Sequence, residues 1–283
     1  MKKFLFIIAT CLLVLLAIFV YIKIDSSRPH HFEVTFLNVG QGDSALIQFE
    51  NGQKMLVDCG ANKIVLSALG RHLPFYDRTI DYVLATHPDL DHYGGCVDVL
   101  QRYNVKNIIV NGKEKVYDPY WQEWNALMHS EPGANIITMA SPTVWIIASD
   151  TLQFLSPDPS LPLNVAAADS NNYSIVFKLT HGNETFLFTG DMEVPLENAL
   201  MGKYCGTKTS CPAIRANVLK VGHHGSDGGS SESFLRFVNP ATAVISAGVR
   251  NRYGHPALRV IRHLERVGAT VLRTDKLGDI VVK

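Results

Sequence analysis

The sequence has no excess of either charge, since 26 lysine and arginine residues balance 26 aspartate and glutamate residues over 283 positions. A neutral chain has no general attraction to nucleic acid, although a local basic groove is compatible with this total. The sequence also lacks internal repeats, a G-x-S-x-G motif and a C-x-x-C pair. These absences argue against a serine-hydrolase nucleophile and a cysteine-based zinc site. The length and the 47% hydrophobic content suit one large domain or two small ones.

Cysteine is scarce, with five residues in the chain. Cys205 and Cys211 bracket a short polar loop, GTKTS, and a disulfide is predicted between them if the loop is exported. Cys59 and Cys96 each follow a motif and are expected to be separate buried thiols, with a second disulfide as the alternative.

The first 25 residues set the location. Residues 4–22 form an apolar run of 19 residues without a charge, which spans a hydrocarbon core of about 30 Å as a helix. A signal peptide has a shorter apolar region and an A-x-A-like cleavage site, and no such site follows here. We therefore expect residues 1–25 to be an uncleaved membrane anchor; a cleaved signal, leaving a secreted or periplasmic protein, and a buried core helix are the alternatives. Lys2 and Lys3 favour a cytoplasmic N-terminus and an extracytoplasmic remainder.

Residues 32–283 are predicted to form one domain in which strands and helices interleave. Apolar runs bounded by turn residues predict strands, and helical spacing predicts helices between them. Long antiparallel blocks with intervening helices indicate an α+β fold of two sheets packed face to face and covered by helices. The proline-rich segment 156–170 is expected to be a loop at the rim of a site or a mobile one. Strands are expected at 31–37, 45–49, 54–57, 81–86, 106–110, 136–139, 144–147, 151–155, 173–180, 184–189, 217–221, 242–246, 270–272 and 279–282, and helices at 63–72, 95–103, 119–129, 193–201, 231–238 and 256–267.

The stretch THPDLDHYGGC carries four potential metal ligands within six residues: His87, Asp89, Asp91 and His92. It follows an apolar strand and precedes a helix that we expect to start at the two glycines, so these side chains can converge at a sheet edge. Imidazole and carboxylate groups are ligands for zinc, manganese and iron. The alternative without a function is an aspartate that caps the helix beside histidines on the surface. Four potential ligands in this spacing favour a metal site instead.

This motif resembles the His-x-His-x-Asp-His signature of the metallo-β-lactamase superfamily, in the form with aspartate at the middle position that is seen in the ComEC competence-protein branch. Further stretches resemble that branch in order, namely residues 36–60, 171–179, 186–193, 218–226 and 251–256. The resemblance implies a four-layer αββα sandwich and two divalent metal ions, zinc or manganese. It covers nearly all of residues 32–283, whereas the multi-span channel region of a full ComEC is not in this sequence.

The resemblance also implies the ligand sets. Asp191, after an apolar strand, is expected to bridge the ions, with His87 and Asp89 on the first ion. The second ion is expected to take Asp91, His92 and His224. No histidine stands at the usual position before Asp191, so the first ion has an oxygen-rich shell that favours manganese over zinc. His181 is expected to be exposed in a hairpin turn.

Adjacent side chains on an extended strand point to opposite faces, so His223 and His224 are not expected to bind the same ion. We assign His224 as the ligand and His223 to the substrate or to orienting the site, and the reverse order stays open. Asp91, His223 and His255 are the candidate catalytic residues. Asp58 and Asn172 are expected to orient the metal ligands through hydrogen bonds without binding an ion themselves.

The predicted reaction is hydrolysis, because paired divalent ions make water reactive without a protein nucleophile. Ser226, Arg252 and His255 are the candidate substrate-binding residues, since backbone amides at a helix start, a guanidinium and an imidazole suit a phosphate. The favoured function is a phosphodiesterase or nuclease outside the cytoplasm, linked to DNA uptake, that reads single-stranded DNA through its backbone.

Several alternatives remain open. Bases could stack on Tyr253 or on the aromatic residues of 119–124, although packing within a helix explains the latter better. A hydrolase of a cell-envelope phosphoester or lactone on the same scaffold, and a non-catalytic metal-binding module, are the alternative functions. Asn38 replaces the aspartate that this branch usually carries before Val-Gly-Gln-Gly-Asp, which could alter the support beneath the site. The oligomeric state is not determined by the sequence.

Overall fold

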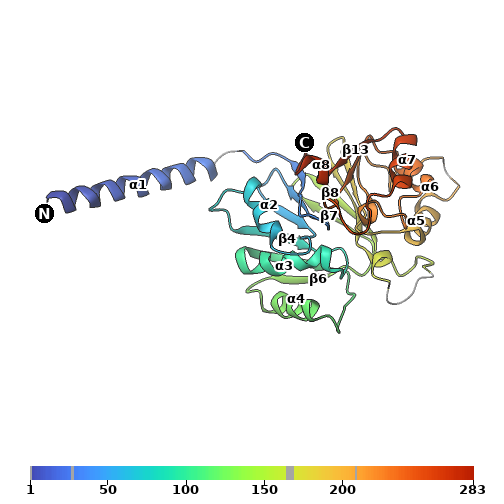
Figure 1. Cartoon of the computed structure of the whole chain (residues 1–283), viewed down its shortest axis with the longest axis horizontal. Helices are drawn as coiled ribbons and strands as arrows, with labels where there is room; N and C mark the ends of the chain where they lie inside the picture. Colours follow the sequence, from blue (N-terminus) through green and yellow to red (C-terminus); the bar gives the residue numbers. More distant parts are fainter. Residues whose placement is uncertain (1, 27–28, 164–168, 208) are drawn as a thin grey trace.

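The computed structural model describes residues 2–26, 29–163, 169–207 and 209–283, and the side chains of 24–26 are not described. Two seven-stranded sheets form the centre of the domain (Figure 1). The first has the order β14-β1-β2-β3-β4-β5-β6 and the second β13-β12-β11-β10-β9-β8-β7. The strands of the first sheet are β1 (Glu33–Phe36), β2 (Ala45–Gln48), β3 (Lys54–Val57), β4 (Thr79–Leu84), β5 (Asn104–Val110), β6 (Asn135–Thr138) and β14 (Ile280–Val282). Those of the second are β7 (Thr143–Ile147), β8 (Asp150–Ser156), β9 (Val176–His181), β10 (Glu184–Phe188), β11 (Val218–Lys220), β12 (Thr242–Ile245) and β13 (Thr270–Arg273).

Three buried clusters define the layers. One lies between the sheets and is rich in phenylalanine, including Phe36, Phe177 and Phe188. A second joins the outer face of the first sheet to α2 (Ile64–His72), α3 (Leu90–Arg102) and α4 (Pro119–Ser130). A third joins the second sheet to α5 (Val194–Leu200), α6 (Glu232–Val238) and α7 (Leu258–Arg266). The predicted αββα sandwich is therefore confirmed. Short helical segments complete the chain: η1 (Asn171–Tyr173), η2 (Met201–Cys205), η3 (Gly222–Gly225) and α8 (Thr274–Leu277).

The sheets are mixed, and the expectation of antiparallel blocks is only partly right. Strands β3 to β6 run parallel, as do β10 to β13, because helices such as α2 and α3 carry the chain back between successive strands. This arrangement matters for the site, because the carboxyl ends of parallel strands meet at one edge of each sheet.

Helix α3 begins at Leu90, five residues before the predicted start at Gly95. Gly94 and Gly95 therefore lie inside the helix, where close packing explains them. A Cβ on Gly95 would lie 2.2 Å from the carbonyl oxygen of Cys59, and one on Gly94 would lie 2.4 Å from that of Ala61. Glycine thus lets α3 lie directly against the chain after β3.

Two disulfides are present among the described residues. Cys205–Cys211 confirms the prediction for the polar loop, of which Lys208 lies outside the described residues. The expectation that Cys59 and Cys96 are separate thiols is wrong, because they are bonded to each other. Their Cα atoms lie 5.2 Å apart, since the glycine-mediated contact brings α3 against the end of β3.

The structure also bears on the predictions for His181, for the aromatic residues of 119–124 and for the proline-rich segment. His181 is not an exposed turn residue: it ends β9, its ring stacks on Phe32 with the centroids 4.0 Å apart, and its Nδ1 lies 2.6 Å from Asp150 Oδ1. Trp121 and Trp124 are buried, which confirms helix packing for two of the 119–124 aromatics, whereas Tyr120 is exposed. Of the proline-rich loop, residues 164–168 lie outside the described residues.

Helix α1 (Lys2–Ser26) projects from the domain (Figure 1). It is long and apolar enough to cross a membrane by length and composition, a test that signal sequences near an N-terminus also pass.

Candidate metal centre

The candidate ligands lie where parallel strands end. Asp58 follows β3, His87 follows β4, Asp191 follows β10, and His223 and His224 follow β11. Asp91 and His92 come from the first turn of α3. Asp89 directly precedes that helix. All six candidate ligands, from His87 to His224, therefore lie at the same end of the sandwich.

The group proposed for the second ion is compact. His92 Nε2 lies 3.2 Å from Asp191 Oδ1, and His224 Nε2 lies 3.4 Å from Asp191 Oδ2. His224 Nε2 is also 3.2 Å from Asp91 Oδ2. Potential donor atoms of Asp91, His92 and His224 lie within 4.8 Å of one another, which suits a common metal ion.

The group proposed for the first ion is wider. His87 Nε2 lies 3.8 Å from Asp89 Oδ2 and 3.9 Å from Asp191 Oδ2. Asp89 is also held from outside, because its Oδ1 accepts a hydrogen bond of 2.5 Å from Ser170 and forms an ion pair with Lys115. Asp191 is shared by the two groups: its Oδ2 lies near both His87 and His224, and its Oδ1 lies near His92.

The two adjacent histidines do not lie on an extended strand, so the reasoning from alternating faces is wrong. Strand β11 ends at Lys220, and His223 and His224 both have left-handed backbone conformations, with φ of 48° and 52°. His223 Nε2 lies 3.8 Å from Asp191 Oδ2, so both rings approach the Asp191 carboxylate. Glu193 Oε1, at 2.9 Å from His223 Nδ1, orients the His223 ring. A second imidazole besides His87 therefore stands near the first group, for which the sequence had predicted an oxygen-rich shell.

The donor set fits divalent metal ions. The Nε2 atoms of His87, His92 and His224 and Oδ1 of Asp191 are buried and lack hydrogen-bond partners among the described residues. Buried polar atoms are costly unless something pairs with them. Burial, together with the nearby His92, lowers the pKa of His87 to about 4, so its imidazole is neutral at pH 7, the form that binds metal. Burial also lowers the pKa of His92 and of His224, but Asp191 and a second carboxylate outweigh it and raise both pKa values, so these two rings would release protons on binding metal.

Each of the three candidate histidine ligands has a partner at its Nδ1 atom, as metal-binding histidines usually do. His92 Nδ1 donates to Asp58 Oδ2 at 2.9 Å. His87 Nδ1 lies 3.0 Å from the hydroxyl of Thr86, which donates in turn to Asp58. The predicted supporting position of Asp58 thus corresponds to its contacts, whereas Thr86 was not predicted.

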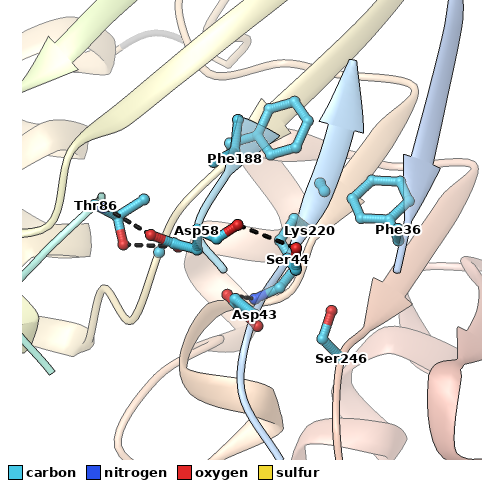
Figure 2. Close-up of a pocket in the computed structure, with 11 residues that line it drawn as sticks. Phe36, Asp43, Ser44, Asp58, Thr86, Phe188, Lys220 and Ser246 are labelled. Carbon is cyan, nitrogen blue, oxygen red and sulfur yellow. Dashed lines mark hydrogen bonds and ion pairs between the residues drawn. The ribbon is translucent and has the colours of Figure 1, made fainter. Parts of the chain in front are cut away.

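Asp43 and Lys220 were also missed. Asp43 Oδ1 lies 3.0 Å from His224 Nδ1, which donates its hydrogen bond to the carbonyl oxygen of Ser246, also at 3.0 Å. The other oxygen of Asp43 forms a buried ion pair with Lys220. Figure 2 shows this pair beneath the site, beside Ser44 and Asp58. A cavity of about 10 Å³ lies there, close to the volume one water molecule needs. A charged residue within the apolar strand β11 was the available signal for Lys220.

Asn172 does not contact the candidate ligands directly. Its side-chain oxygen accepts hydrogen bonds from the backbone amides of Glu193 and Leu196, at 3.3 and 3.1 Å. It therefore fixes the start of α5, just after Asp191. The neighbouring Asn171 side chain lies 3.4 Å from Glu193 and from His223.

Of the candidate substrate residues, His255 lies nearest to the centre. Its ring centroid is 5.6 Å from that of His223 and 6.4 Å from that of His224, and its buried Nδ1 has no partner among the described residues. Burial and the two neighbouring histidines lower the pKa of His255. The exposed Arg252 donates to the hydroxyl of Tyr253 at 2.7 Å.

The expected anion site at the helix start after residue 223 is not supported. The backbone amides of Ser230 and Ser231 donate to Glu197, at 2.5 and 3.1 Å, and are therefore already occupied. Ser226 Oγ accepts a hydrogen bond from the amide of Gly228. The replacement Asn38 is accommodated locally, since its Oδ1 accepts from the amide of Gly40 at 3.2 Å.

Comparisons with known proteins agree with this geometry. The chain is 32% identical to ComE operon protein 3 of Bacillus subtilis over 95% of this chain, and 30% identical to competence protein ComA of Neisseria gonorrhoeae over 93%. It spans only about a third of these relatives, 35% and 34% of their lengths.

Among solved structures, the diiron β-hydroxylase CmlA of Streptomyces venezuelae matches 90% of this chain and 55% of its own, with a TM-score of 0.60 and 14% identity. Zinc-bound PqqB of Methylobacterium extorquens matches 89% of this chain and 99% of its own, with a TM-score of 0.54 and 10% identity. These two likenesses show the fold alone. The model of the metallo-β-lactamase superfamily matches residues 37–249, and the chain belongs to that superfamily.

Proposed function

We propose that this metallo-β-lactamase-superfamily hydrolase cleaves phosphodiester bonds in a nucleic-acid strand, outside the cytoplasm. The position of Asp191 carries the proposal. One oxygen lies 3.2 Å from His92 and the other 3.4 Å from His224 and 3.9 Å from His87, so the carboxylate stands between two potential ion positions. Paired ions of this kind suit in-line displacement at phosphorus.

In this proposal, His87, Asp89 and Asp191 hold one ion, and Asp91, His92, Asp191 and His224 hold the other. Zinc or manganese would supply the positive charge that activates water and stabilises the leaving oxygen. The residues of the chain bind and orient the substrate. His223, fixed by Glu193, and His255, with its unpartnered Nδ1, face phosphoryl oxygens, while Arg252 attracts the anionic strand.

Two features support the location outside the cytoplasm. Helix α1 has the length and composition of a membrane span. Two disulfides are typical of an oxidising compartment. Protease added outside intact cells is expected to digest the domain, and full protection would contradict this topology.

The reaction is tested with the full-length chain in detergent, loaded with manganese or zinc. We expect about two ions per chain and hydrolysis of both single-stranded DNA and an aryl phosphodiester. Asp191→Asn should lower both activities by at least about 100-fold, because even residues that only support metal ligands contribute 10–100-fold. Asp227→Asn, in an exposed carboxylate, is the matched control and should leave them unchanged.

The other outcomes identify the alternatives. Cleavage of the aryl ester without DNA cleavage would favour an envelope phosphoester or lactone as the substrate. Stoichiometric metal without turnover would favour a non-catalytic module. Folded protein that binds no divalent ion would refute the proposal as a whole.

A further inference from the structure

A cavity of about 520 Å³ adjoins the metal centre on the side of Asp89. The loop between β5 and α4 forms one wall, and Pro88 and Ser170 form part of the other. This volume falls within the usual range for pockets that bind small ligands, about 300–1,000 Å³. None of the residues assigned above to the substrate lines it.

Asp89 connects the cavity to the metal centre. Its Oδ2 faces His87 at 3.8 Å, while its Oδ1 is bound by Ser170 and Lys115, both of which line the cavity. The cavity is therefore separated from the centre by a single side chain and its two partners, a distance that a nucleotide next to the reacting phosphate can span.

The wall contributed by the β5–α4 loop combines charged side chains with an aromatic and an aliphatic one. Tyr117 is 96% exposed and Val116 is 50% exposed, although both are large hydrophobic side chains. At the same wall, Lys113 Nζ lies 3.7 Å from the centroid of the Tyr173 ring, which places a cation at the edge of the cavity. A flat ligand with an anionic end suits this combination better than an inorganic anion does.

Two of the three acidic groups that line the cavity are hydrogen-bonded by amides of the chain itself, which stabilise their charge. Asp118 caps α4 by accepting from the amide of Tyr120 at 2.9 Å. Asp169 accepts from the backbone amide and side chain of Asn172, at 3.1 and 2.8 Å. The third, Glu114, is exposed to solvent.

We propose that this cavity holds the nucleoside next to the scissile phosphate, with its base stacked on Tyr117 and the following phosphate near Lys113. The inference rests on the proposed function and assigns its substrate class: a single strand whose bases are free to stack. Aromatic stacking accepts every base, so the cavity selects unpaired nucleic acid rather than a base sequence.

Tyr117→Ser tests the stacking in the full-length, metal-loaded chain, with Tyr120→Ser as the matched control. Tyr120 is 61% exposed on α4 and does not line the cavity. Substrates are an oligothymidylate, a deoxyribose-phosphate oligomer of the same length without bases, and an aryl phosphodiester. We expect Tyr117→Ser to raise KM for the oligothymidylate about tenfold, in line with the contribution of one stacked base. The control should stay within about twofold of the unsubstituted chain.

The oligomer without bases separates stacking from a general effect. The unsubstituted chain should prefer oligothymidylate to it, Tyr117→Ser should lose that preference, and aryl-ester hydrolysis should not change. If DNA is cleaved but Tyr117→Ser retains both KM and the preference, the cavity assignment is overturned and the proposed function stands. If the unsubstituted chain cleaves the aryl ester but neither binds nor cleaves oligothymidylate, both are overturned.

Discussion

The buried ion pair between Lys220 and Asp43 gives a sharp test of how the site is supported. Figure 2 shows the two side chains in contact, and both are at most 6% exposed. Lys220 also donates to the carbonyl oxygen of Val221 at 2.8 Å. Lys220→Met keeps most of the volume of the side chain but leaves the Asp43 carboxylate without its cation. Breaking a buried pair in this way costs about 3–5 kcal/mol.

The contact between Asp43 and His224 remains in this variant, so we expect the lower end of that range, about 3 kcal/mol. Adding Asp43→Asn removes the stranded charge, and the double variant should recover most of the loss. The surface pair of Arg236 with Glu232 provides the control: Arg236 is 69% exposed, Glu232 keeps its second partner Arg266, and Arg236→Met should cost less than about 1 kcal/mol.

Urea unfolding of the full-length chain in a non-ionic detergent, followed by tryptophan fluorescence with EDTA present, measures these differences. Trp121 and Trp124 are buried and report loss of the core. A loss below about 1 kcal/mol for Lys220→Met, or a double variant no more stable than the single one, would refute the account of a charge-compensated support beneath the site.

Three further predictions follow from individual contacts. Asp58→Asn weakens the support of His92 and should lower metal affinity about 10–100-fold, measured by competition with a chromophoric chelator; unchanged affinity would contradict the support. Burial raises the pKa of Asp279, but the hydrogen bond from Arg71 and other hydrogen bonds outweigh this effect and lower the pKa from 3.8 to about 2. The ionised Asp279 therefore stabilises the folded protein above about pH 4, and this contribution is lost as the pH falls through 2. Because the pair is partly exposed to solvent, Asp279→Asn should cost only about 1 kcal/mol at pH 7 and nothing near pH 2, and a difference independent of pH would argue against it. Cys96→Ala opens a loop with a sequence separation of 37 and should cost about 3–4 kcal/mol in urea unfolding under oxidising conditions, and equal stability of the two chains would contradict a bonded pair.

The sequence alone identified the fold and the metal-binding motif because their signals are local. Alternating apolar runs define the strands, and the spacing from His87 to His92 concentrates ligands at a strand end. The position of α3 was mispredicted at its start, because Gly94 and Gly95 resemble a helix boundary although they serve a close contact.

Other features depended on contacts between segments that are distant in the chain. The Cys59–Cys96 disulfide, the approach of His223 to Asp191, and the pairing of Lys220 with Asp43 each join residues at least 30 positions apart. The cavity beside Asp89 arises in the same way, from Ser170 and the loop before α4. Sequence patterns show which residues lie at the end of a strand, because the periodicity that reveals a strand is a local property of the chain. Which of them meet is decided by the packing of the two sheets and the crossovers between parallel strands, and only the tertiary structure contains that information.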